Sequence, residues 1–142
     1  MRFPARVLLL AVLGVGLLCR GCSHTEKRAE PIQSLAQIPA PNSELYAHVQ
    51  DYEHWRNPFL VVLSDRIRVH CSATAFEKKV PVGLLHKTLL SLPLSAWPYG
   101  SIVAVQAGGG PQNDANLRLV EQNRVQVEAI LKAAGVTIDY WP

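Results

Sequence analysis

A run of three glycines stands where α/β proteins often bind ligands. Gly108, Gly109 and Gly110 follow an apolar run that predicts a strand and precede a long helical pattern, and ligands of open α/β sheets collect at such strand-to-helix turns. The turn has neither the Lys of a phosphate-binding loop nor a G-x-G-x-x-G pattern. These glycines and Asn113 therefore form a candidate ligand loop, with a mobile surface turn as the simpler interpretation.

Cys71 and His70 have the residue types of a nucleophile and its base. Adjacent residues on a strand point to opposite faces of the sheet, so these two side chains cannot form a hydrogen bond with each other. A half-buried structural cysteine is the better interpretation.

Four potential metal ligands lie close together in the sequence: His48, Asp51, Glu53 and His54. On a helix only His48 and Asp51 share a face, so a complete ligand set is not presented. We therefore predict no catalytic, cofactor-binding or metal-binding residues, which favours a non-catalytic role.

Aromatic residues gather near the ends of two predicted strands. They are Trp97, Tyr99, Tyr140 and Trp141. Their simplest role is in the core and at its rim, and the alternative is a protein-binding patch.

The elements that would position these residues follow from hydrophobic periodicity. An uncharged β-branched run at residues 101–106 predicts a strand buried on both faces, at the centre of a sheet. Further strands are predicted at 59–63, 66–71 and 136–141, helices at 83–92 and 115–134, a short helix at 44–52, a loop at 72–79 and a helix cap at Asp114.

This order predicts an α+β fold, a two-layer β-β-α-β-α-β arrangement with two helices on one face of a mixed sheet. It covers residues 57–142 and follows a tether and entry segment at 23–56, which is flexible to about residue 41. Val103 and Val105 are expected to include the residues that face the helices. The apolar stripes that the helices should turn toward the core are Leu85, Leu89 and Leu92 in the first, and Leu117, Val120, Val127, Ile130, Leu131 and Ala134 in the second.

The charge of the sequence argues against nucleic-acid binding. Three of the 14 basic residues lie in the first 20 residues, which leaves 11 basic residues against 11 acidic ones. A nucleic-acid binder needs a basic face to release counterions from the phosphate backbone.

Residues 1–22 have the pattern of an export signal, which indicates a location outside the cytoplasm. Arg2 and Arg6 precede an apolar run at 7–18 that is too short to span a membrane. Cys22 follows Gly21 and is the expected lipidation site, and Cys19 is the alternative. Simple secretion and an uncleaved anchor remain open, but a lipid-anchored protein facing the periplasm or cell exterior of a bacterium is favoured.

The predicted hairpin, the helix VPVGLLHKTLLSLP, the strand GSIVAVQ and the long helix that leads into LKAAGVTIDYW together resemble the periplasmic domain of the ExbD/TolR family over about the last 85 residues. The resemblance implies an interaction domain that engages an envelope protein or the cell wall. It carries over no functional residue, because the apolar run at 7–18 lacks the acid of that family's membrane helix. The alternative function is a small-ligand-binding or enzymatic envelope domain that uses the Gly108–Gly110 loop.

Overall fold

The computed structural model describes residues 32–108, 110 and 113–142, which form a mixed five-stranded sheet with two helices. Cys19, Cys22 and Gly109 lie outside the described residues. The strands lie in the order β3-β2-β1-β4-β5, with antiparallel pairing from β3 to β1 and parallel pairing from β1 to β5. Their bounds are β1 (Phe59–Val62), β2 (Ile67–Cys71), β3 (Phe76–Val80), β4 (Ile102–Ala107) and β5 (Thr137–Trp141).

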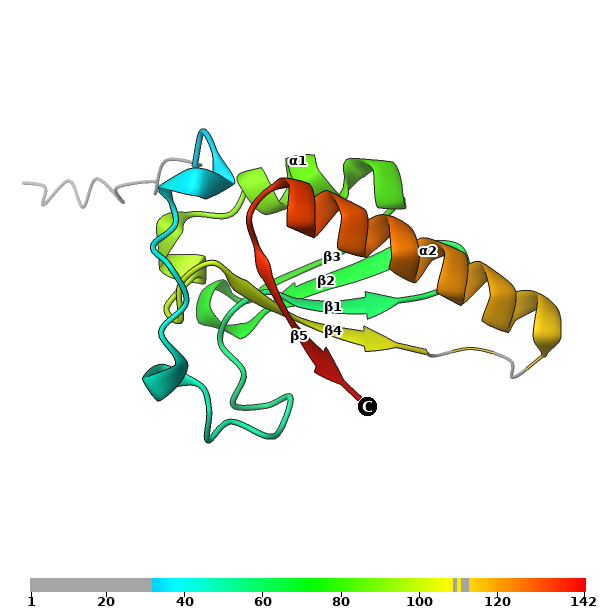
Figure 1. The fold of residues 1–142 in the computed structure, drawn as a ribbon, viewed down its shortest axis with the longest axis horizontal. Coiled ribbons are helices and arrows are strands. Elements are labelled where there is room, and N and C mark those ends of the chain that lie inside the picture. The colour runs from blue at the N-terminus through cyan, green and yellow to red at the C-terminus, as the bar shows by residue number, and fades with distance from the viewer. Residues whose placement is uncertain (1–31, 109, 111–112) are drawn as a thin grey trace, which may run out of the picture.

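Two helices, α1 (Leu85–Leu90) and α2 (Asp114–Ala133), cover the same face of the sheet (Figure 1). The predicted α+β class, with a mixed sheet and both helices on one face, is therefore confirmed. The middle strand is β1, while the predicted centre, β4, lies inside the sheet between β1 and β5.

One strand of the sheet, β3, was not predicted from the sequence. Residues 72–79 were expected to form a loop, but β3 runs from Phe76 to Val80 and pairs with all five residues of β2. Its three central residues, Glu77, Lys78 and Lys79, are charged and exposed, so β3 lacks the apolar alternation that marks a half-buried strand.

The long helix α2 begins and ends through its caps. The side chain of Asn113, rather than the predicted Asp114, accepts the hydrogen bond from the backbone N–H of Asn116 at 2.9 Å. Gly135 follows the C-cap residue Ala134 and takes a φ of 71°, a conformation that glycine adopts at little cost. Asn123 holds the helix to the β1–β2 turn by donating to the carbonyl oxygens of Leu63 and Ser64.

The core between the sheet and the helices contains most of the residues that the helical stripes predict. Leu85, Leu89 and Leu92 are buried, as expected, and so are Val127 and Leu131 of α2. Leu117 was also expected in the core, yet it is 48% exposed because the first turns of α2 extend past the end of the sheet (Figure 1). Val103 and Val105 both face this core.

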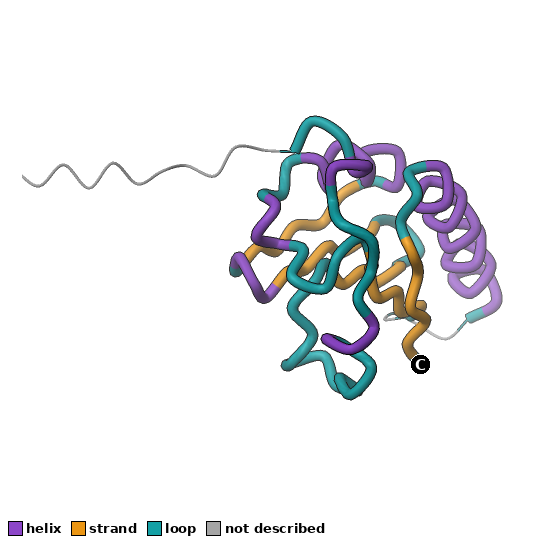
Figure 2. The backbone as a smooth tube through the Cα atoms, turned by 60° about the vertical axis from the view of Figure 1, so that its left-hand side comes forward, coloured by secondary structure: helices purple, strands orange, loops and turns teal. Residues whose placement is uncertain are grey.

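The opposite face of the sheet carries a second, smaller core that the helices do not touch. It consists of Trp55, Phe59, Tyr99, Ile102 and Ala104, all buried. The chain before β1 covers this face as a long irregular segment, drawn mainly in teal in Figure 2. The prediction of a short helix at 44–52 is wrong, since only a 3-10 turn at Ser43–Leu45 forms there.

The segment before residue 41 is partly in the core and so is not a flexible tether throughout. Leu35 and Ile38 are buried against the helical side of the sheet. The backbone N–H of Ser101 donates to the carbonyl oxygen of Pro39 at 2.8 Å. Gly100 allows this approach, because a Cβ there would lie 2.4 Å from the carbonyl oxygen of Ala40.

Candidate functional site

A cluster of aromatic rings in contact with one another occupies the sheet face that the helices leave free. Trp55 is its centre and makes edge contacts with Tyr46, Tyr99 and Trp141, at centroid distances of 5.9, 5.3 and 5.6 Å. Phe59 meets Trp141 at 5.4 Å. These separations fall in the range in which edge-to-face aromatic pairs attract, so the cluster joins β1, β5 and the entry segment.

A buried asparagine between the entry segment and β1 ties the chain to the start of β4. Asn57 is completely buried, and its side-chain amide donates to the carbonyl oxygens of Gly100 and Ile102 at 2.8 and 2.7 Å. Its carbonyl oxygen accepts from the backbone N–H of Tyr99 at 2.9 Å. The Asn57 side chain thus uses both of its amide donors and one of the two lone pairs on its oxygen. These bonds fix the chain that leads into β1.

A hollow of about 500 Å³ opens beside this cluster at the end of β5. We call it the β5 hollow. Its walls are the entry segment on one side and the end of the chain on the other, and its lining residues are Tyr46, Ala47, Val49, Gln50 and residues 139–142. It therefore combines aromatic walls with the carboxylate of Asp139 at the edge of the sheet, the mixture typical of a binding pocket.

The outer side of β5 presents unpaired backbone groups next to the hollow. β5 is the last strand of the sheet, and the N–H of Thr137 points inward to the carbonyl oxygen of Ser101 at 2.9 Å. Since successive residues of a strand alternate in direction, Ile138 and Tyr140 direct their N–H and C=O groups away from β4. Within the described chain no backbone hydrogen bond joins this side of β5 to another segment.

The four aromatic residues do not form the single binding patch that was the alternative to a role in the core and at its rim. Trp97 and Tyr99 are buried, and they belong to the cores on opposite sides of the sheet. Tyr140 is 54% exposed on the helical side, where burial and the neighbouring Glu128 raise its pKa, while Trp141 lies on the other side in the aromatic cluster. Of these four aromatic residues, only Tyr140 and Trp141 border the β5 hollow.

The predicted ligand loop shows no assembled site in its described residues. Gly108 and Gly110 take positive φ values of 134° and 151°, and Asn113 uses its side-chain carbonyl oxygen to cap α2. These observations account for the glycines and for Asn113 by backbone conformation and capping.

Cys71 is completely buried rather than half-buried. Its Sγ lies 3.4 Å from the carbonyl oxygen of Arg56 and 3.5 Å from that of Ala96. Burial raises the pKa of the thiol, which lowers its reactivity at neutral pH. His70 faces the other side of the sheet, where Tyr52 packs on its ring at 4.9 Å.

The four candidate metal ligands are dispersed along an irregular segment. Asp51 and His54 form an exposed pair, with Nδ1 of His54 2.6 Å from a carboxylate oxygen of Asp51, and this contact lowers the pKa of Asp51. Over residues 32–108, 110 and 113–142, no three His, Cys, Asp or Glu side chains lie close enough together to hold a metal ion. No helix in that part of the chain is long and apolar enough to cross a membrane.

Most of the β5 hollow was not predicted from the sequence. Tyr46 and Val49 were assigned to a helix, whereas Asp139 was a polar residue inside an apolar strand. The available signal was the pattern Asp139-Tyr140-Trp141: an edge strand with an acid and an indole on the same face, two residues apart.

Comparison of the chain with protein-family models, with curated proteins and with solved structures finds no match. The resemblance to the ExbD/TolR periplasmic domain stays a prediction.

Proposed function

We propose that this chain is an exported, lipid-anchored protein of the bacterial cell envelope whose domain binds a partner protein, in the manner expected from the ExbD/TolR resemblance. We further propose that the domain binds an extended segment of the partner along β5. The observation that carries this proposal is the unpaired outer side of β5, with the β5 hollow at its end.

Strand addition to a sheet edge is an established way to recognise peptides. Main-chain hydrogen bonds to the edge give affinity, and pockets beside the edge select side chains. Ile138 and Tyr140 supply the two outward-facing residues for main-chain pairing, and the β5 hollow supplies a pocket. The Trp141 indole is held in place by Trp55 and Phe59, so this side of the pocket is organised before a partner binds.

The docking edge is tested by removing one outward N–H. Tyr140→Pro deletes an amide that points away from β4, which an edge strand tolerates, whereas Tyr140→Ala removes the same side chain and keeps the amide. Heptapeptides selected from a displayed random library on the wild-type protein should bind the alanine variant more tightly than the proline variant, because both variants lack the tyrosine side chain and only the proline variant lacks the amide. Equal binding to both variants would show that β5 does not pair with the peptide.

The lipid anchor has its own test, because the residues concerned precede the described chain. Cells grown with a clickable fatty acid should label the wild-type protein and the Cys19→Ala variant, but not the Cys22→Ala variant. Labelling of Cys22→Ala with loss in Cys19→Ala would assign the lipid to Cys19. Absence of label in the wild type would leave secretion or an uncleaved anchor as the mode of export.

A further inference from the structure

We infer that the β5 hollow binds a cationic side chain, arginine or lysine, of the extended segment that pairs with β5. This inference rests on the proposed function and adds to it the chemical class of residue that the partner presents. Four observations on the described residues carry it: a carboxylate with a free oxygen, aromatic walls, a one-sided local charge and the geometry of a paired strand.

The carboxylate of Asp139 is held in place by a hydrogen bond to one of its two oxygens. Its Oδ2 accepts a hydrogen bond from Nε1 of Trp141 at 3.0 Å, while its Oδ1 accepts no hydrogen bond within the described chain. Trp141 is itself fixed by its contacts with Trp55 and Phe59. The free oxygen is therefore available to a donor that enters the hollow, and a charged donor forms the strongest bond to it.

Aromatic rings flank the place where such a donor would lie. Tyr46 and Trp141 both line the hollow, from the entry segment and from β5. A cation close to the face of a tyrosine or tryptophan ring is attracted by the ring, and a planar guanidinium also stacks on it. The alkyl part of arginine or lysine would cover apolar surface of Val49 at the same time.

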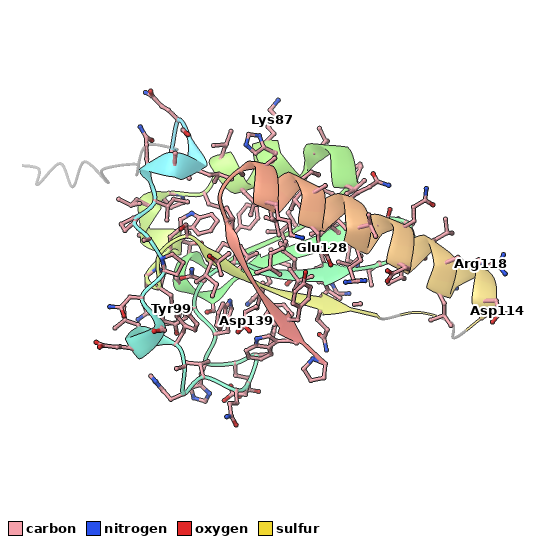
Figure 3. All side chains as sticks on the ribbon, in the orientation of Figure 1. Lys87, Tyr99, Asp114, Arg118, Glu128 and Asp139 are labelled. Atoms are coloured by element: carbon pink, nitrogen blue, oxygen red, sulfur yellow. The ribbon has the colours of Figure 1, made fainter. Side chains whose placement is uncertain are left out.

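The local charge favours a cation over an anion. Residues 42–55 and 137–142 contain four acids, Glu44, Asp51, Glu53 and Asp139, and they contain no lysine or arginine. On the helical side, Arg124 is already paired with Glu121 and Glu128, at 2.7 and 2.5 Å. Figure 3 shows Asp139 and Glu128 on opposite sides of β5, so this pair leaves Asp139 free.

A segment paired with β5 would deliver its side chains to the hollow at regular spacing. Successive residues of a strand point to opposite faces, so every second residue of the partner lies on the face of Asp139 and Trp141. Only one of these needs to be basic, and it would lie next to the carboxylate. The inference thus predicts an alternating segment with a lysine or arginine among the residues on this face.

The test uses three fluorescein-labelled peptides with acetylated and amidated ends and the pattern Thr-Xaa-Thr-Xaa-Thr-Xaa-Thr, in which Xaa is arginine, glutamine or glutamate. The alternation places Xaa on the hollow side in every second register. Binding to the full-length protein in non-ionic detergent is measured by anisotropy at about 0.15 M salt, where charges more than about 8 Å apart are largely screened. The arginine peptide should bind about tenfold or more tightly than the glutamine peptide, and the glutamate peptide should bind least.

Two variants with the same change in charge separate the hollow from the general field. Asp139→Asn keeps an acceptor for Trp141 and should weaken binding of the arginine peptide about tenfold, while the glutamine peptide changes by less than about twofold. Glu53→Gln removes an acid of the same segment that does not line the hollow, and it should leave both affinities within about twofold. Thermal unfolding of both variants checks that each is folded.

The outcomes distinguish this inference from the proposed function. Equal affinity for the arginine and glutamine peptides, with both lost in Tyr140→Pro, overturns the cationic pocket and keeps the docking edge. If no peptide responds to Tyr140→Pro, the docking edge is wrong and the paired placement of the cation falls with it. Self-association of the chain through β5, detected by sedimentation, would also contradict the inference, because the occupant would then be a second copy.

Discussion

The two edge strands of the sheet, β3 and β5, differ in the side chains that flank their unpaired backbone groups. β3 has Glu77, Lys78 and Lys79 in succession, all exposed. β5 has a single acid, Asp139, between Ile138 and two aromatic residues, and a hollow lies beside it. Charged residues, lysine above all, are the usual protection of an edge strand against pairing with another chain. The difference indicates that β3 is protected and that β5 is available.

A further contrast lies in what supports each edge. The aromatic cluster and the Asn57 hydrogen bonds hold the entry segment beside β5. A smaller hollow of about 300 Å³ beside β3 is lined by Lys78, Lys79 and Lys87 together with residues of the α1 region. The β5 side is thus a built aromatic surface, whereas the β3 side is a solvated basic one.

The largest expected effect is that of Asn57→Ala, which leaves two buried backbone groups, the N–H of Tyr99 and the carbonyl oxygen of Ile102, without their side-chain partner, while the carbonyl oxygen of Gly100 keeps its bond from the N–H of Ile102. Each unsatisfied buried group costs about 1–3 kcal/mol, so we expect a loss of about 2–6 kcal/mol in the free energy of unfolding. Denaturant unfolding measures it, with Glu77→Ala on exposed β3 as the control within about 0.5 kcal/mol. A loss under about 1 kcal/mol for Asn57→Ala would show that the entry segment is not held in this way.

Substitutions in the core under the helices should lower the stability of the domain and leave the binding difference between the edge strands β3 and β5 unchanged. Val103→Ala and Val105→Ala each remove two methyl groups from a fully packed site and should cost about 2–4 kcal/mol. Peptide binding below the melting temperature should keep its dependence on residue 140 in both variants. Wild-type stability in both would show that β4 is not the buried strand described above.

The protection of β3 is tested by removing its charges. Lys78→Thr combined with Lys79→Val replaces both lysines of this edge with uncharged β-branched residues and keeps Glu77, so we expect dimers or larger species to form through it. Sedimentation velocity should show an association constant at least tenfold higher, which is about 1.4 kcal/mol. Arg118→Thr combined with Lys132→Val changes the charge equally at exposed positions of α2 that do not line the hollow beside β3, and serves as the control. If both double variants stay monomeric, the lysines of β3 do not protect the edge.

The smallest effect concerns the Asp51–His54 pair of the entry segment. The hydrogen bond from His54 lowers the pKa of Asp51 below its usual 3.8, so the pair stabilises the folded state above that pH. This contribution is lost as pH falls below 3.8 through the lowered pKa, and it is small because both side chains are exposed. The difference in melting temperature between wild type and Asp51→Asn should therefore narrow in acid. A difference that stays constant would exclude this pair as its source.

The sequence predicted the elements with strong periodicity and missed those that tertiary contacts create. The two helices and four of the strands follow from apolar spacing alone, and the burial of Trp97 follows from the apolar composition of the connection around it. β3 was missed because its central residues are charged, and pairing with β2 rather than burial makes it a strand. The same limit explains residues 44–52, where helical spacing was visible but packing of Tyr46 and Tyr52 on the aromatic cluster prevails.

The candidate site was less predictable than the fold. Trp141 was singled out, but its partners come from segments about 85–95 residues earlier in the sequence, and no local pattern links them. Asp139 gives no signal of its own, because a single acid in an edge strand is common. The hollow exists only once β5 has paired with β4 and the entry segment has been fixed by Asn57.

The most direct test of the central claim, that β5 and not β3 is the docking edge, is residue-resolved amide hydrogen exchange. The full-length protein is measured alone and with the arginine peptide described above. In the free protein the amides of Ile138 and Tyr140 should exchange faster than those of Thr137 and Asp139, because they point away from β4. The peptide should slow Ile138 and Tyr140 and leave residues 76–80 unchanged. Protection gained in residues 76–80, with none at Ile138 and Tyr140, would contradict the account.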